Sequence, residues 1–271
     1  MDFIVVLPFV FIFGLMAGSF MNVCIYRIPR EKSVVKPRSS CPQCGRLIRW
    51  YDNIPLLSYC VLGGKCRICK AVISFRYFLV ELLTGISFVL FFYYGYVNGG
   101  IPLSVIYIYF VSSLIVCTFI DFEFYIIPDS ISLSGIGVGL LAGLLVPQML
   151  GEVTHLKGLL FSFIGALVGG GVLFIIAIVA EYILKKEAMG MGDVKLMAMI
   201  GAFIGWKLVL LTLFFSSLIG SVIGIILIVA GKANMQSKIP FGPYICLGAI
   251  IALFFGNLLT DWYIGLIVNI H

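Results

Sequence analysis

Four of the eight cysteines lie in two pairs whose spacing is typical of a metal site. Cys41-Pro-Gln-Cys44 and Cys66-Arg-Ile-Cys69 are separated by twenty-one residues. Each pair offers two sulfur ligands from one tight turn, and Gly45 permits the backbone conformation that such a turn needs. Four thiolates suit a tetrahedral zinc ion in a closed structural site, so the pattern predicts zinc on these four cysteines. Two disulfides or an iron–sulfur cluster are the alternatives.

A second kind of chemistry is suggested by carboxylates at the ends of apolar runs. Asp121 and Asp129 belong to one such motif, and Asp193 closes the motif Gly190-Met191-Gly192-Asp193. Two carboxylates brought close together cannot both ionise easily, so one keeps a proton while the other activates a water molecule. Such a pair hydrolyses an amide without a metal, and the two glycines would let the backbone approach a substrate strand. The alternative is that these aspartates are helix N-caps, and Asp129 looks most like one.

Membrane helices must position these residues, because the 271-residue chain is 62% apolar, 11% charged and has a mean hydropathy of +1.16. The apolar runs repeat at about 20 residues, the length that a helix needs to cross a bilayer. We therefore expect an all-α polytopic membrane protein with about eight transmembrane helices. The predicted spans are residues 3–23, 77–97, 101–120, 131–149, 158–184, 194–207, 208–231 and 242–269.

The net charge of +6 is explained by membrane topology rather than by nucleic-acid binding. If the N-terminus lies outside, sixteen of the eighteen basic residues fall in interior loops, and only Lys157 and Lys207 lie outside. The interior set comprises eleven residues between Arg27 and Arg76, with Lys185, Lys186, Lys195, Lys232 and Lys238.

This topology predicts three regions. Residues 1–24 form a first transmembrane helix, which we interpret as retained rather than as a signal peptide, because no basic residue precedes it. Residues 25–76 form the only sizeable aqueous segment, and a cytoplasmic location favours zinc over disulfides because that compartment is reducing. Residues 77–271 form the remaining transmembrane domain.

The ordered motifs resemble those of the bacterial type IV prepilin peptidases, which are leader peptidases and N-methyltransferases of the membrane GxGD aspartyl protease group. The resemblance covers nearly the whole chain. It rests on Gly18-Ser19-Phe20-Met21-Asn22-Val23, the two cysteine pairs, Trp50-Tyr51-Asp52-Asn53-Ile54-Pro55, Arg76-Tyr77 with Val80-Glu81-Leu82, Ile120-Asp121 with Ile127-Pro128-Asp129, Gly190-Met191-Gly192-Asp193-Val194-Lys195, and Ile239-Pro240-Phe241-Gly242-Pro243.

The resemblance implies that Asp121 and Asp193 are the catalytic pair, with Asp129, Gly190, Gly192 and Lys195 in support. It implies cleavage of a basic leader from prepilins and pseudopilins at the cytoplasmic face of the inner membrane. The new N-terminal residue would then be methylated with S-adenosylmethionine.

The methyl donor's site is not identified by any sequence motif, because the cytoplasmic segment has no Gly-rich dinucleotide-type loop. The resemblance favours the metal-binding segment, with Asp52, Asn53 and Glu81 as candidates.

Three other readings of the sequence remain open. The protein could be a leader peptidase only, a transporter lined by carboxylates, or a zinc-stabilised membrane scaffold without chemistry. Against a transporter, the acidic motifs lie at one membrane face and no internal repeat relates the two halves of the chain.

Overall fold

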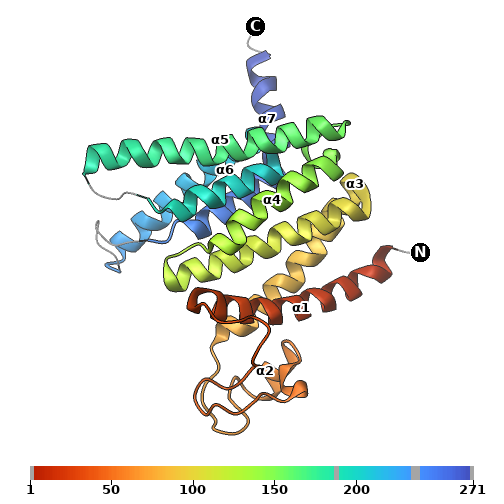
Figure 1. The fold of residues 1–271 in the computed structure, drawn as a ribbon, viewed down its shortest axis with the longest axis vertical. Coiled ribbons are helices and arrows are strands. Elements are labelled where there is room, and N and C mark those ends of the chain that lie inside the picture. The colour runs from red at the N-terminus through yellow and green to blue at the C-terminus, as the bar shows by residue number, and fades with distance from the viewer. Residues whose placement is uncertain (1–2, 186–188, 233–238, 269–271) are drawn as a thin grey trace. The chain divides into compact units, whose positions relative to one another are not determined.

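The computed structural model describes residues 3–185, 189–232 and 239–268, and these are mostly helical, apart from the largely irregular segment of residues 28–74 (Figure 1). The described residues contain no strand, only two isolated β-bridges. The all-α prediction, with a cysteine cluster after the first long helix, is therefore confirmed. The elements are α1 Phe3–Arg27, η1 Ile28–Arg30, η2 Trp50–Asn53, α2 Leu57–Val61, α3 Phe75–Phe124, α4 Asp129–Leu145, η3 Pro147–Leu150, α5 His155–Leu184, α6 Met191–Val229 and α7 Gly242–Val268.

Two of the long helices are each made of two segments joined at a glycine. Gly100 in α3 and Gly205 in α6 have φ values of 77° and 79°, which break the helix. Gly100 lies between the predicted spans 77–97 and 101–120, whereas Gly205 lies two residues before the predicted end of the span 194–207. In α3 the chain folds back on itself at the break. The Ser104 hydroxyl, which follows the break, donates a hydrogen bond at 2.9 Å to the carbonyl oxygen of Phe92, which precedes it. Each of the eight predicted spans thus overlaps mainly with one long helical segment, although the span 131–149 runs beyond α4 into η3.

The number of membrane crossings stays a prediction. Among the described residues, five helices are long and apolar enough to cross a membrane, counting α3 and α6 as one each. The helix α4 is apolar but has only 17 residues. Lys186 and Lys238, which belong to the predicted interior set, lie outside the described residues.

The chain divides into two compact units, residues 1–116 and residues 117–271, and α3 runs through the boundary. In the first unit, α1 packs against the beginning of α3 through small residues. A side chain at Gly18 would meet the backbone of Glu81 at 2.8 Å, and one at Gly14 would meet that of Gly85 at 2.9 Å. Such close backbone approach is the usual way in which membrane helices associate.

The second unit contains the end of α3 and the helices α4 to α7. Gly165 of α5 and Gly201 of α6 face each other so closely that a side chain on either would lie about 2 Å from the other's carbonyl oxygen. The buried Ser162 hydroxyl donates to the carbonyl oxygen of Ala202 at 2.7 Å, which adds a polar contact between the same two helices. This packing holds α5 against the part of α6 that lies about two turns after Asp193.

Candidate active site and metal centre

Asp121 lies in the last turn of α3, at the point where the helix ends. The Tyr125 N–H donates to the Asp121 carbonyl oxygen at 2.9 Å, and Tyr125 takes a left-handed conformation with φ 56° that stops the helix. An extended stretch to Pro128 then leads into α4. The Asp121 side chain is 5% exposed, so the helix end places a carboxylate inside the protein.

Asp193 lies in the first turn of α6. Gly190 is the N-cap residue, and the Asp193 N–H donates to its carbonyl oxygen at 3.1 Å. Gly192 packs against Ile127, since a side chain there would meet the Ile127 Cβ at 3.0 Å. At Gly190 no atom lies closer than 3.8 Å to the position of a Cβ. Of the two glycines, Gly192 is therefore the one that close packing requires.

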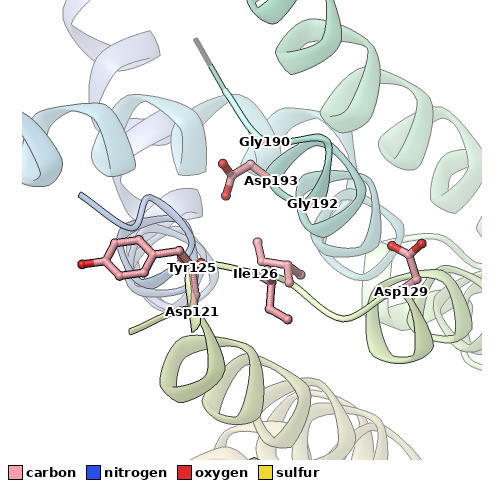
Figure 2. Close-up of a pocket in the computed structure, with 8 residues that line it drawn as sticks. Asp121, Tyr125, Ile126, Asp129, Gly190, Gly192 and Asp193 are labelled. Carbon is pink, nitrogen blue, oxygen red and sulfur yellow. The ribbon is translucent and has the colours of Figure 1, made fainter. Parts of the chain in front are cut away.

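The two aspartates, which are far apart in the sequence, line one pocket of about 250 Å³ (Figure 2). The pocket lies within the second unit, between the α3–α4 turn and the start of α6. Its lining residues are Asp121, Tyr125, Ile126, Ile127, Asp129, Gly190, Gly192 and Asp193. The structure thus places both predicted acidic motifs at one cavity.

None of the three aspartates is an N-cap, so the capping interpretation is wrong. The N-cap of α4 is Pro128 and that of α6 is Gly190, whereas Asp121 is at a helix C-terminal end. Asp129, the residue that looked most like a cap, is the first residue of α4 and has a different partner. Pro128, the residue before Asp129, is the N-cap of α4, and its φ of −66° suits that position.

The partner of Asp129 is Lys195, which is in the second turn of α6. The Lys195 Nζ donates to both carboxylate oxygens of Asp129 at 2.7 and 2.8 Å. This ion pair joins the segment after Asp121 to the turn that carries Asp193. Figure 2 shows the Asp129 carboxylate set apart from those of Asp121 and Asp193, which agrees with a supporting rather than a catalytic position.

Sequence reasoning did not assign a role to Gly242, yet its backbone contacts the pocket. The Gly242 N–H donates to Oδ2 of Asp121 at 3.0 Å. The residue belongs to the Ile239–Pro243 motif that helped to identify the family resemblance. The available signal was a glycine that lies between Pro240 and Pro243 at the start of an apolar run, but this signal does not reveal a partner 121 positions away.

The metal centre lies in the first unit, where the sulfur atoms of Cys41, Cys44, Cys66 and Cys69 lie within 4.8 Å of one another. The Sγ atoms of Cys41 and Cys69 are 3.7 Å apart. A zinc tetrahedron with Zn–S bonds of about 2.3 Å has edges of about 3.8 Å, whereas a disulfide needs about 2.05 Å. All four cysteines are free. The donor set therefore fits a structural zinc ion, and the described cysteines are not paired as disulfides.

The cysteine pairs form two copies of one knuckle. In the first, the Cys41 N–H donates to the Arg46 carbonyl oxygen at 2.9 Å, and in the second the Cys66 N–H donates to that of Ala71 at 2.8 Å. In both copies an isolated β-bridge joins the residues that flank the knuckle, Ser40 with Leu47 and Lys65 with Val72.

The cysteine environment suits metal binding. Backbone hydrogen bonds from Cys69 and Ile68 lower the pKa of the Cys66 thiol to about 6, which favours the thiolate that a metal needs, whereas burial and the neighbouring thiols raise the pKa of Cys69 to about 11. Gly45 and Lys70 occupy the matching left-handed position of each turn, with φ values of 68° and 58°.

The residues proposed as candidates for the methyl donor have other contacts. The Arg67 guanidinium donates to both oxygens of Asp52 at 2.6 to 3.0 Å, and these bonds lower the pKa of that carboxyl. Glu81 is buried and accepts a hydrogen bond from the Leu56 N–H at 2.8 Å. Both carboxylates therefore anchor the metal-binding segment, the first internally and the second to α3.

Comparison with known proteins agrees with this arrangement. Residues 12–94 match the Bacterial Peptidase A24 N-terminal domain, and residues 108–225 match the Type IV leader peptidase family. A prepilin leader peptidase/N-methyltransferase of Aeromonas salmonicida is 37% identical over 96% of this chain and 94% of its own length. The protein of that name from Pseudomonas aeruginosa is 35% identical over 93% of this chain and 91% of its own length.

A third relative, from Myxococcus xanthus, is 40% identical over 85% of this chain, which spans 66% of that relative's length. No solved structure matches the chain. A helical membrane fold with two aspartates at one cavity and a four-cysteine centre defines a class of membrane-embedded aspartyl peptidase. The chain belongs to the type IV leader peptidase family.

Proposed function

We propose that this multi-pass membrane protein removes the leader peptide from prepilins and pseudopilins and methylates the new N-terminal amine. Relatives over nearly the whole chain carry the name prepilin leader peptidase/N-methyltransferase. The observation that carries the peptidase assignment is the shared pocket, because Asp121 and Asp193 come from separate helices and both line it.

The pocket supplies what amide hydrolysis needs. Two carboxylates that face one cavity can share a single proton, so one activates water while the other protonates the substrate. Buried or partly buried acidic groups in a membrane protein are costly to maintain and are usually retained for chemistry. Asp129, Lys195, Gly190 and Gly192 support the pair through the ion pair and the α6 turn.

We assign the second activity to residues 25–76 and the peptidase to residues 77–271. S-Adenosylmethionine would supply the methyl group when bound. The structural zinc ion would be held by Cys41, Cys44, Cys66 and Cys69. Its role is to fold this segment, because Cys41 and Gly64 are the only buried residues between positions 28 and 74.

We further propose that the N-terminus is outside and that the pocket opens at the cytoplasmic face of the inner membrane. The basic residues support this orientation: eleven lie from Arg27 to Arg76, and Lys195 lies next to the pocket. A prepilin would keep its apolar helix in the lipid and present its basic leader at this interface.

The test is cleavage of a purified prepilin by wild-type protein and by the variants Asp121→Asn and Asp193→Asn in detergent. Neither carboxylate alone can activate water and protonate the substrate, so each variant is expected to lose at least about a thousandfold in rate. Thermal unfolding of each variant in the same detergent checks that it is folded.

A residual rate above about a tenth of wild type, which is a loss below roughly 1.4 kcal/mol, would remove that residue from the catalytic pair. A transporter or a scaffold would cleave nothing, even as the wild-type protein.

A further inference from the structure

The two pocket aspartates differ in their hydrogen bonding, and this difference deepens the function proposed above, on which it rests. Oδ2 of Asp121 accepts the Gly242 N–H at 3.0 Å. Among the described residues, the Asp193 carboxylate has no hydrogen-bond partner, although its backbone N–H is bonded within the α6 turn. The protein therefore holds the Asp121 carboxylate by a hydrogen bond, whereas the Asp193 carboxylate lines the pocket without one.

Gly242 is the first residue of α7. The first N–H groups of a helix have no partner within the helix and carry the positive end of its dipole. A carboxylate that accepts such an N–H is favoured over its protonated form. The contact is buried, where a hydrogen bond to a charged group is strong.

The contact depends on glycine for steric reasons. A Cβ at position 242 would lie 2.7 Å from Oδ2 of Asp121 and 3.2 Å from Cδ1 of Ile127. Its backbone needs no left-handed conformation, since Gly242 is absent from the positive-φ residues of the described chain. Any side chain would push the carboxylate away from the N–H that holds it.

We propose that Gly242 is a positioning residue that holds Asp121 as the ionised member of the pair, which makes Asp121 the base and Asp193 the acid.

The assignment gives a balanced reaction. Asp121 takes a proton from water as the water oxygen bonds to the scissile carbonyl carbon, and Asp193 gives its proton to the carbonyl oxygen. The neutral diol then collapses: Asp121 returns its proton to the leaving nitrogen, the C–N bond breaks, and Asp193 recovers a proton from one hydroxyl. The products are a carboxylic acid and an amine, and the enzyme regains its starting protonation.

Other titratable groups near Asp121 do not replace this contact. The Asp129 charge across the pocket is paired with Lys195. The other ionisable side chains near Asp121 are the thiols of Cys117 on α3 and Cys246 on α7 and the phenol of Tyr125 at the pocket wall, and none of them is a carboxyl group.

The test is the pH–rate profile of prepilin cleavage by Gly242→Ala. We expect kcat to fall roughly 10- to 100-fold, as when one hydrogen-bond donor to a reacting group is lost, with KM within about twofold of wild type. Because the ionised form loses its donor, the acidic limb of the profile should move about one unit to higher pH. A structural defect alone would lower the amount of active enzyme without moving this limb.

Gly256→Ala is the matched control, since Gly256 is also on α7 and its Cβ would meet the side chain of Leu208 at 2.4 Å. It should keep the wild-type acidic limb. If Gly242→Ala does not fold, the double variant Gly242→Ala/Ile127→Val removes the second crowding atom and takes its place.

A folded position-242 variant with wild-type kcat and acidic limb would overturn the proposal. The proposed peptidase function of the two aspartates would still stand if Asp121→Asn and Asp193→Asn were inactive. If instead those two variants cleaved normally, the proposed function would fail and this inference with it.

Discussion

The metal-binding segment and the aspartate pocket are stabilised by different means. From residue 28 to residue 74 only Cys41 and Gly64 are buried, and large side chains such as Trp50 and Val61 are 75% and 78% exposed. In α6, by contrast, the seven consecutive residues Met199–Gly205 are all buried. The first region has almost no core, whereas the helix that carries Asp193 continues into a fully buried stretch.

On the proposed division of the two activities, this difference predicts that they can be disturbed separately. A segment without a core depends on its metal, because binding free energy takes the place of burial. The pocket depends on close helix contacts at glycines, where a single methyl group is enough to displace a backbone. Metal removal and glycine substitution therefore attack different regions.

The largest expected effect comes from removing metal ligands. Cys66→Ser/Cys69→Ser should lose the zinc ion and with it the fold of residues 28–74, since structural zinc contributes about 10–16 kcal/mol in small domains. Elemental analysis should fall from about one zinc per chain to near zero. Methylation of a pre-cleaved substrate should be lost, and cleavage should be impaired less.

Cys60→Ser is the control, because Cys60 is exposed and is not part of the four-sulfur cluster. Zinc loss in that variant would show that the ligand set is wrong. Equal loss of both activities in the double variant would mean that the segment also shapes the protease.

A smaller effect is expected at the two glycines beside Asp193. Gly192→Ala would push against Ile127 at 3.0 Å and shift the turn, so cleavage should fall about tenfold. Gly190→Ala has free space and should keep more than about half of the wild-type rate. Steady-state cleavage of prepilin by both variants measures the contrast, and equal losses would show that packing against Ile127 is not the reason for glycine at position 192.

The smallest expected effect is a difference in zinc retention between variants of the two knuckles. Lys70 holds a left-handed conformation that costs a non-glycine residue about 1 kcal/mol, whereas Gly45 holds the equivalent position freely. Lys70→Gly should therefore raise zinc retention against a chelator a few-fold, and Gly45→Lys should lower it. Zinc release into a colorimetric chelator reports both changes, and an unchanged or reversed order would contradict the equivalence of the knuckles.

Much of the fold was predictable because a bilayer fixes the length of an apolar run. The break at Gly100 fell between two predicted spans, since a helix must end before the chain can turn back, and the break at Gly205 came two residues before the predicted end of its span. The helix α2 was not predicted, because five residues held by contacts with η2 and α3 leave no periodic pattern.

The site was predictable where spacing carries the chemistry, as in the cysteine pairs and the GxGD motif. It was not predictable where tertiary packing decides. The Asp129–Lys195 ion pair and the Gly242–Asp121 hydrogen bond join positions 66 and 121 residues apart, and neither partner can be named from local sequence. The capping alternative for Asp129 failed for the same reason.

The most direct test of two separate sites is methylation of a pre-cleaved substrate by Asp193→Ala with S-adenosylmethionine. Mass spectrometry of the product distinguishes leader loss from the gain of one methyl group. We predict that the variant leaves an intact prepilin uncut but methylates the pre-cleaved substrate at the wild-type rate, because Asp193 lies in the second unit and the metal centre in the first. A folded Asp193→Ala protein that failed to methylate the pre-cleaved substrate would contradict the division, and the two activities would have to share one site.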